Sequence, residues 1–368
     1  MLRSITTILC FAMAITASAA ETSIGDVALS KADALADIYN WHAAAPFYAE
    51  AERFFTARRD TRKALFAHIG YIRATFEQRS FSETARYFSN VCDGPVAAND
   101  PEVQFKCLIA KGDTDAEIDS APAEADWRRV LALARRLHNE KWQIRATGEI
   151  GFARYVQGDH TTAKKNTGIA LLQCQKTGDW AGVIRFSSGI GTGLALGGFE
   201  QMGMPYLDNA IRLARQYPES GYPYMAVAGK AMALIQKNDY DKAEAYAIQQ
   251  SERAKADGRM VKFTQAQLFI SDIAIRRGQR ATAIKILTDT LPIAQQNHTR
   301  LLRDVDSKLS DLYRQQGDLK LADHFAESAL VACQYSHDMY LAPSILLTIA
   351  RMKITLGKGF WCKLGQFG

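Results

Sequence analysis

Residues Leu309–Leu330 read LSDLYRQQGDLKLADHFAESAL. Apolar residues recur at helical spacing on both sides of Gly317, and small residues follow at Ala322, Ala326 and Ala329. Apolar side chains three or four positions apart predict the buried face of a helix. A glycine directly after such a segment predicts the end of that helix. The stretch therefore predicts two helices packed against each other across a tight turn.

The same pattern recurs every 39 or 40 residues towards the N-terminus. The turn position of Gly317 is taken in earlier copies by Gly278, Asn238, Gly198 and Gly158. Small residues recur five residues after each of these turns (Ala163, Gly203, Ala243, Ala283, Ala322) and seven before each (Gly151, Gly191, Ala231, Ser271, Ser310). Small side chains let two helices approach closely. We expect an all-α superhelical solenoid of stacked helix pairs with a period near 40 residues.

Two further turns are expected earlier in the chain, at Arg79-Ser80-Phe81 and Asn40-Trp41-His42. The pattern is degenerate between residues 95 and 140, where Gly112-Asp113 resembles a turn and Thr114–Ala125 reads as an acidic, alanine-rich insertion. We interpret this part as a repeat with a long loop. The repeat array is expected over residues 21–357, with an irregular tail over 358–368.

The order of small and large residues resembles a tetratricopeptide repeat (TPR). The positions that carry the resemblance are Leu309, Tyr313, Gly317-Asp318, Ala322, Ala329 and Leu330. Thr61–Ala110 is also similar to the N-terminal arrays of larger bacterial exported TPR proteins, in which a CHAT protease, diguanylate cyclase or histidine kinase follows. The resemblance implies a non-enzymatic scaffold without a cofactor that binds a protein or peptide. The alternative is the regulatory part of a signalling enzyme or CHAT protease whose effector domain is missing here.

In the TPR family the binding surface is a concave groove lined by the first helix of each pair. Carried onto this sequence, the groove positions are Arg145, Phe152, Tyr155, Arg185, Met225, Met232, Gln265, Asp272, Asp304, Asp311 and Arg314. The resemblance thus implies a mixed groove, basic at one end and acidic at the other, that suits a peptide or protein segment. The lysine of the chaperone-binding clamp is absent, because Gly148, Ser188, Ala228, Leu268 and Ser307 occupy its place.

Residues 1–20 have the features of a signal peptide. Arg3 precedes the apolar run Ile8–Ile15, and Ser18-Ala19-Ala20 forms a small-residue cleavage site. A membrane anchor is the weaker interpretation, because a spanning helix needs about 20 apolar residues. We expect a periplasmic or secreted protein that begins at Glu21 and has no later membrane span.

Export would permit disulfide bonds. Five cysteines remain after the signal: Cys92, Cys107, Cys174, Cys333 and Cys362. The odd number leaves at least one without an internal partner. Cys92 and Cys107 are the candidate disulfide, and two packed thiols are the alternative. No CxxC pair and no histidine cluster indicates a metal site.

Other motifs indicate no catalytic residue and no nucleic-acid site. The net charge of +6 comes from arginine pairs interleaved with acids, not from a basic stripe. Gly189–Gly193 (GIGTG) lacks the further glycine of a dinucleotide loop, because Leu194 takes its place, so close helix packing is the better interpretation.

The C-terminal helix expected over Pro343–Leu356 is apolar around much of its circumference and has no second helix after it. We therefore expect an exposed apolar edge and self-association there. Whether the chain is complete or shortened after Leu356 stays open.

Overall fold

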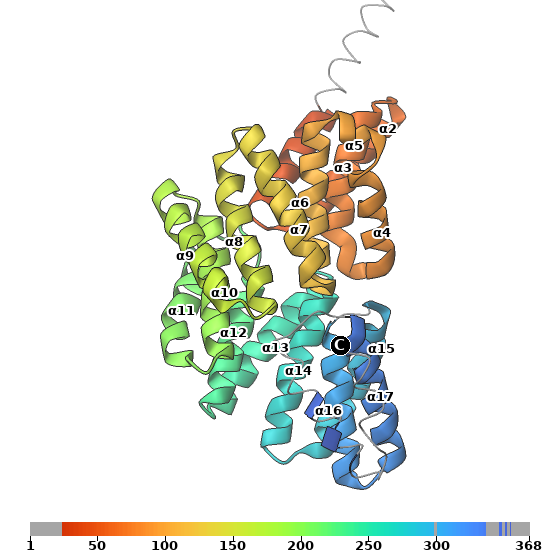
Figure 1. Cartoon of the computed structure of the whole chain (residues 1–368), viewed down its shortest axis with the longest axis vertical. Helices are drawn as coiled ribbons and strands as arrows, with labels where there is room; N and C mark the ends of the chain where they lie inside the picture. The colour runs from red at the N-terminus through yellow and green to blue at the C-terminus, as the bar shows by residue number, and fades with distance from the viewer. Residues whose placement is uncertain (1–23, 298–299, 336–345, 348–349, 352–353, 355–368) are drawn as a thin grey trace, which may run out of the picture. The chain divides into compact units, whose positions relative to one another are not determined.

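The computed structural model describes residues 24–297, 300–335, 346–347, 350–351 and 354. Every regular element in these ranges is a helix, and they contain no strand. The predicted all-α fold is therefore confirmed (Figure 1). None of the helices in this part of the chain is long and apolar enough to span a bilayer.

The chain divides into two compact units. Unit 1 contains residues up to Thr75 together with Glu219–Gly221, and unit 2 contains the rest. Unit 1 holds a helix over residues 24–37, α2 (Trp41–Ala57) and α3 (Thr61–Thr75). Unit 2 holds the 3-10 turn η1 (Phe76–Gln78), α4 (Phe81–Cys92), α5 (Pro95–Asn99), α6 (Pro101–Ile118), α7 (Ser120–Arg136), α8 (Glu140–Val156), α9 (His160–Thr177), α10 (Trp180–Leu196), α11 (Glu200–Gln216), α12 (Tyr224–Gln236), α13 (Tyr240–Ala256), α14 (Met260–Arg276), α15 (Arg280–Asn297), α16 (Arg300–Gln316) and α17 (Leu319–Tyr335).

Unit 1 packs aromatic rings against small residues. Ala32, Ala44 and Tyr48 are buried in one cluster, and the Tyr48 ring lies against Gly70, where a Cβ would fall 2.4 Å from it. The Tyr48 hydroxyl donates a hydrogen bond to Asp33 at 2.6 Å. The predicted turn before Trp41 is present, because Asn40 caps α2 by accepting from the Ala43 amide.

The predicted turn positions of unit 2 are confirmed. The residues between the two helices of each pair are Gly158, Gly198, Asn238, Gly278 and Gly317, and all have φ between +60° and +87°. This left-handed backbone conformation carries little steric cost for glycine and is tolerated by asparagine. The period of 39 or 40 residues thus arises from one recurring backbone requirement.

The prediction of a long loop at Thr114–Ala125 is wrong. These residues belong to α6 and α7, and only Asp119 separates the two helices. Asp115 inside this segment and Asp126 directly after it are both buried, and both pair with Lys111. Gly112 is likewise no turn: it lies inside α6, where a Cβ would fall 2.9 Å from the Trp127 ring.

Several sequence-based expectations concern parts of the chain outside the described residues. They are the signal peptide over residues 1–20, the tail over 358–368, and most of the expected helix Pro343–Leu356.

Candidate functional site

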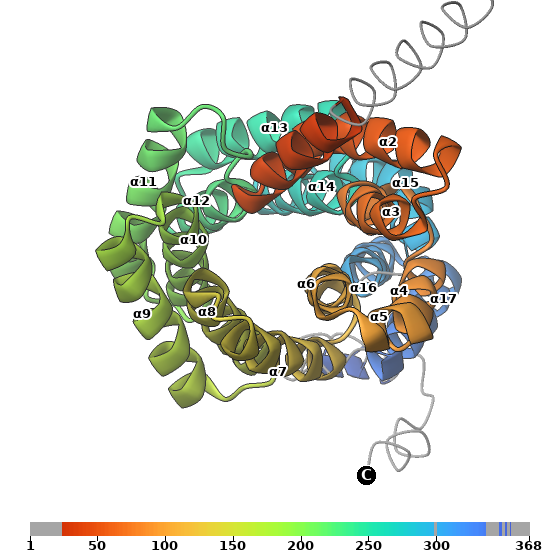
Figure 2. The ribbon, with the colours of Figure 1, turned by 90° about the horizontal axis from the view of Figure 1, so that it is seen from above.

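The first helices of the repeats form the inner side of unit 2. In Figure 2, α10, α12 and α14 lie inside α11, α13 and α9. Each first helix contacts the next one, from α8 through α10, α12 and α14 to α16. We call the sides of these five helices that face inwards the inner face. Every groove residue named by the TPR resemblance lies on one of the five helices.

Arg145 is not available on this face, which corrects its expected role. Its side chain is fully buried, and its Nε and a terminal nitrogen donate to the two oxygens of Asp179 at 2.9 and 2.8 Å. Asp179 also caps α10 by accepting from the Gly182 amide at 3.1 Å. Burial acts to raise the pKa of Asp179, but the hydrogen bonds and charge of Arg145 hold that pKa below its ordinary value. This pair joins α8 to the start of α10.

Arg185 also joins two repeats. Its guanidinium makes two hydrogen bonds of 2.8 Å to the carboxylate of Glu149 on α8 and lies 5.3 Å from the centre of the Phe152 ring. A bidentate pair of this kind fixes orientation as well as charge.

The acidic residues at the other end are paired as well. Asp272 on α14 binds Lys308 on α16, and Asp311 binds Arg314 at 2.6 Å on its own helix. Asp304 accepts from its neighbour Arg303 at 3.1 Å. The expected groove, basic at one end and acidic at the other, is therefore corrected, because these charged side chains form ion pairs within the protein.

Gln265 belongs to the interface between α13 and α14. Its side-chain oxygen accepts from the amide nitrogen of Gln250 at 3.3 Å. Gln250 is fully buried and also donates to the Lys262 carbonyl at 3.0 Å. The contact therefore assigns Gln265 a packing role.

The GIGTG segment is a helix-packing site, as predicted. Residues Gly189–Gly193 lie within α10. The Phe152 ring lies over Gly189, where a Cβ would fall 2.1 Å from it, and the Tyr155 hydroxyl donates to the Gly193 carbonyl at 3.0 Å. On the other side, Thr192 donates to the Met225 carbonyl at 3.0 Å.

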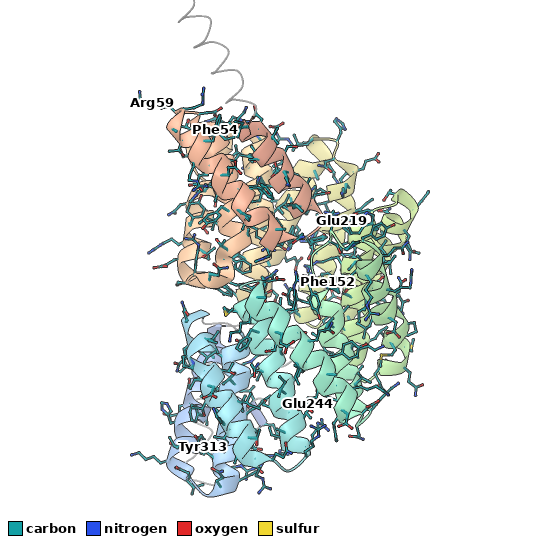
Figure 3. All side chains as sticks on the ribbon, turned by 180° about the vertical axis from the view of Figure 1, so that it is seen from behind. Phe54, Arg59, Phe152, Glu219, Glu244 and Tyr313 are labelled. Carbon is teal, nitrogen blue, oxygen red and sulfur yellow. A yellow bond between two sulfur atoms is a disulfide. The ribbon has the colours of Figure 1, made fainter. Side chains whose placement is uncertain are left out.

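Besides these paired charges, α8, α10 and α12 carry uncharged side chains that are partly exposed. We define the uncharged strip as Phe152, Thr192, Met225 and Met232, all partly exposed. Phe152 is labelled among the side chains in Figure 3. Met225 and Met232 are seven residues apart, so they share one face of α12. The thioether side chains can adapt their shape to different apolar partners.

Several contact partners on this face were missed from the sequence. Glu149, Asp179 and Lys308 pair with residues 34 to 36 positions away, close to one repeat. The repeat period was the available signal, since opposite charges one repeat apart meet on adjacent helices.

The surroundings of Cys174 do not activate its thiol as a nucleophile. Cys174 is buried, its thiol donates to Asp179, and burial raises its pKa to about 12, so it is a poor nucleophile. The described residues contain no group of three His, Cys, Asp or Glu side chains placed to hold a metal ion. An open depression between the start of α15 and the end of α16 is lined by polar residues such as Gln279 and Gln315.

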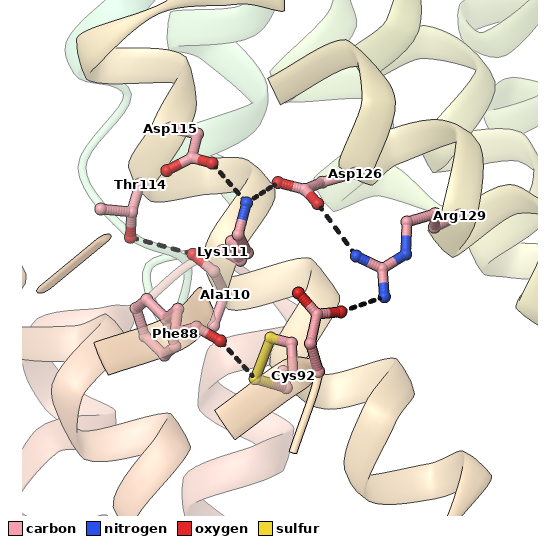
Figure 4. The surroundings of a disulfide bond; sticks show 10 residues. Phe88, Cys92, Ala110, Lys111, Thr114, Asp115, Asp126 and Arg129 are labelled. Atoms are coloured by element: carbon pink, nitrogen blue, oxygen red, sulfur yellow. Dashed lines mark hydrogen bonds and ion pairs between the residues drawn. A yellow bond between two sulfur atoms is a disulfide. The ribbon is translucent and has the colours of Figure 1, made fainter. Parts of the chain in front are cut away.

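The structure joins Cys92 on α4 to Cys107 on α6 in a disulfide, the pair that the sequence analysis named. Their Cα atoms are 5.4 Å apart. Figure 4 shows the charged residues nearby, where Lys111 lies between Asp115 and Asp126 at 2.7 and 2.6 Å. The disulfide and these ion pairs together hold α4, α6 and α7.

A scan against family models and a search of curated proteins found no match. Among solved structures, the chain is similar to a Rap protein complexed with competence and sporulation factor, with a TM-score of 0.63 and 14% identity over 90% of this chain and 93% of that one. Lower similarity is found to the Rap conjugation gene regulator of plasmid pLS20 in complex with the Phr* peptide (TM-score 0.49, 14% identity, 91% and 98% covered). Yeast Tom70 gives a TM-score of 0.44 at 12% identity (94% and 85% covered). The similarity to the first structure shows the fold, which is of the TPR type.

Proposed function

We propose that this protein is a non-enzymatic scaffold that binds an extended peptide or protein segment on the inner face of unit 2. The observation that carries the proposal is the contrast between the uncharged strip and its surroundings. The charged side chains beside the strip, such as Arg185 and Asp272, have partners within the protein. Phe152, Met225 and Met232 remain partly exposed on helices that stacking holds in place. Such a surface favours a segment with apolar side chains over a strongly charged one.

The structural comparison supports a binding role by analogy of fold. The Rap protein that shares this fold was crystallised with competence and sporulation factor bound. A shared fold alone does not fix a ligand, so the chemistry of the strip has to define it.

We further propose that the protein works in the periplasm or outside the cell. The signal-like sequence of residues 1–20 is the first support. The disulfide between Cys92 and Cys107 is the second, since disulfides persist mainly in oxidising compartments.

Selection from a phage-displayed library of random linear peptides tests the binding role, followed by affinity measurement on the selected peptides. Met232→Lys places a charge on the strip and should weaken binding by tenfold or more. Met202→Lys is the matched control, because Met202 is exposed on α11, outside the inner face. Equal affinities of the two variants, or no peptide selected by the unmodified protein, would overturn the proposal.

A further inference from the structure

Two carboxylates distant in sequence contact the first turn of α14. Glu77 in η1 accepts from Nε of Arg259 at 2.5 Å and from the backbone amide of Val261 at 3.0 Å. Glu117, near the end of α6, binds the Lys262 ammonium at 2.9 Å. The two acids are thus 182 and 145 residues away from their basic partners.

Glu77 supplies the cap that α14 lacks locally. The N-cap residue of α14 is Arg259, which makes no side-chain capping bond, and the first turn of α14 contains no acid. A carboxylate at this position satisfies a free amide and interacts favourably with the positive end of the helix dipole. The start of α14 therefore depends on a residue from a different repeat.

A small apolar cluster surrounds the polar contacts. Phe76, Phe81 and Val261 are buried together, with Ile118 and Leu301 packed against them. The Phe76 and Phe81 rings are stacked 5.2 Å apart. We call the contact of Glu77, Glu117 and this cluster with α14 the clasp.

Both carboxylates come from one covalently joined element. Glu77 lies in η1, the turn before α4, and Glu117 lies in α6, while the disulfide between Cys92 and Cys107 ties α4 to α6. The two acids are therefore presented to α14 by one stapled group of helices.

The clasp closes a turn of the superhelix within unit 2. In sequence, helices α7 to α13 lie between α6 and α14, the two helices that the clasp joins. Each of these helices packs on its neighbours. In a repeat protein, stability comes mainly from such contacts between neighbours. Opening the clasp interrupts none of the neighbour contacts between α7 and α13. It also returns Glu77 and Arg259 to water, and their hydration offsets part of the lost ion pair.

We propose that the clasp opens and closes as a unit and thereby sets the width of the inner face. On the basis of the proposed function, we expect the closed form to bind the peptide more tightly than the open form. Glu77 and Glu117 are then positioning residues that act through α14 without touching the ligand.

Charge exchange at Glu117 and Lys262 tests the clasp without a ligand. Glu117→Lys should speed hydrogen exchange in the first turn of α14 and enlarge the radius of gyration in solution scattering, while far-UV circular dichroism stays unchanged. The double variant Glu117→Lys/Lys262→Glu restores opposite charges and should restore both readouts. Unchanged exchange in the single variant would overturn the clasp. Loss of helical signal would overturn it too, because the contact would then be part of the fold itself.

The second arm uses a peptide selected from the random library. Its affinity should fall several-fold in Glu117→Lys and recover in the double variant, a rescue that simple damage to the fold would not give. If Glu117→Lys opens the clasp and leaves the affinity for the peptide unchanged, the proposed link between the clasp and peptide binding is overturned. If the unmodified protein selects no peptide, the proposed function fails, and the exchange measurement still decides whether the clasp exists.

Discussion

The backbones of Gly191 and Gly203 touch where α10 crosses α11. A Cβ on Gly203 would fall 2.5 Å from the Gly191 carbonyl oxygen, and a Cβ on Gly191 would fall 3.0 Å from the Gly203 oxygen. In both cases the added Cβ would collide with a backbone oxygen, which cannot rotate away as a side chain can. The two helices therefore approach as closely as they do because neither residue has a side chain.

Gly203→Ala should accordingly destabilise the protein. Overpacking of a close helix contact costs about 1–3 kcal/mol, and the better helix propensity of alanine recovers about 1 kcal/mol of that. Urea denaturation measures the change in the free energy of unfolding.

Gly168→Ala is the control for this substitution. Gly168 lies inside α9, and a Cβ there would meet nothing within 4 Å. This variant should gain about 1 kcal/mol from helix propensity alone. Changes of the same sign at both glycines would contradict the packing role of Gly203.

Arg145→Ala should be among the most damaging single substitutions on α8. It leaves Asp179 with a side chain only 9% exposed and without its guanidinium partner. Removing one member of a buried ion pair typically costs 3–5 kcal/mol, so we expect a loss of about that size. Lys242→Ala, which breaks the exposed pair with Asp239, should leave thermal unfolding unchanged. A small effect at Arg145 would show that Asp179 finds other partners.

Asp306 should make the protein less stable as the pH rises. Its carboxyl is buried beneath α17, where the Ser328 hydroxyl donates to it at 2.5 Å, and burial raises its pKa to about 6. Because the folded state holds this proton more tightly than the unfolded state, the stabilising contribution is complete below the unfolded pKa of about 4 and is lost as the pH rises through 6.

Asp306→Asn removes this ionisation and keeps an oxygen for Ser328. The variant should match the original near pH 4 and exceed it at pH 7.5 by roughly 2–3 kcal/mol, at 1.36 kcal/mol per pKa unit. Urea denaturation at the two pH values measures this difference. Asp289→Asn, at an exposed residue of α15, retains Asp306 and should therefore keep the original protein's loss of stability between the two pH values.

The turns of the repeats could be predicted because they depend on one residue each. Gly158 and Gly317 stand at left-handed positions that few other residues tolerate. His138 and Arg59 adopt the same conformation, and nothing in their residue type marks them as turns. The repeat pattern alone therefore found the regular part of unit 2 and missed the boundaries of the degenerate part.

The character of the candidate site was harder to predict. Whether Arg145 faces a ligand or is buried depends on Asp179, which lies one repeat later in sequence. The segment Thr114–Ala125 was interpreted as a long loop for the same reason, since the burial of Asp115 depends on Lys111, a cation that it shares with Asp126. Contacts such as Glu77 with Arg259 span 182 residues and leave no local pattern at all.

The disulfide between Cys92 and Cys107 should stabilise the end of unit 2 that carries the clasp. The two cysteines are 15 residues apart, and closing a loop of that length contributes about 3 kcal/mol by limiting the unfolded chain. The variant Cys92→Ala/Cys107→Ala should lose about that amount in urea denaturation, and a reductant should then have no further effect on it. Peptide mapping without reductant should recover the two cysteines in one cross-linked fragment. Recovery of both as free thiols would show that they are packed side by side without a bond, and the clasp would then lack its covalent support.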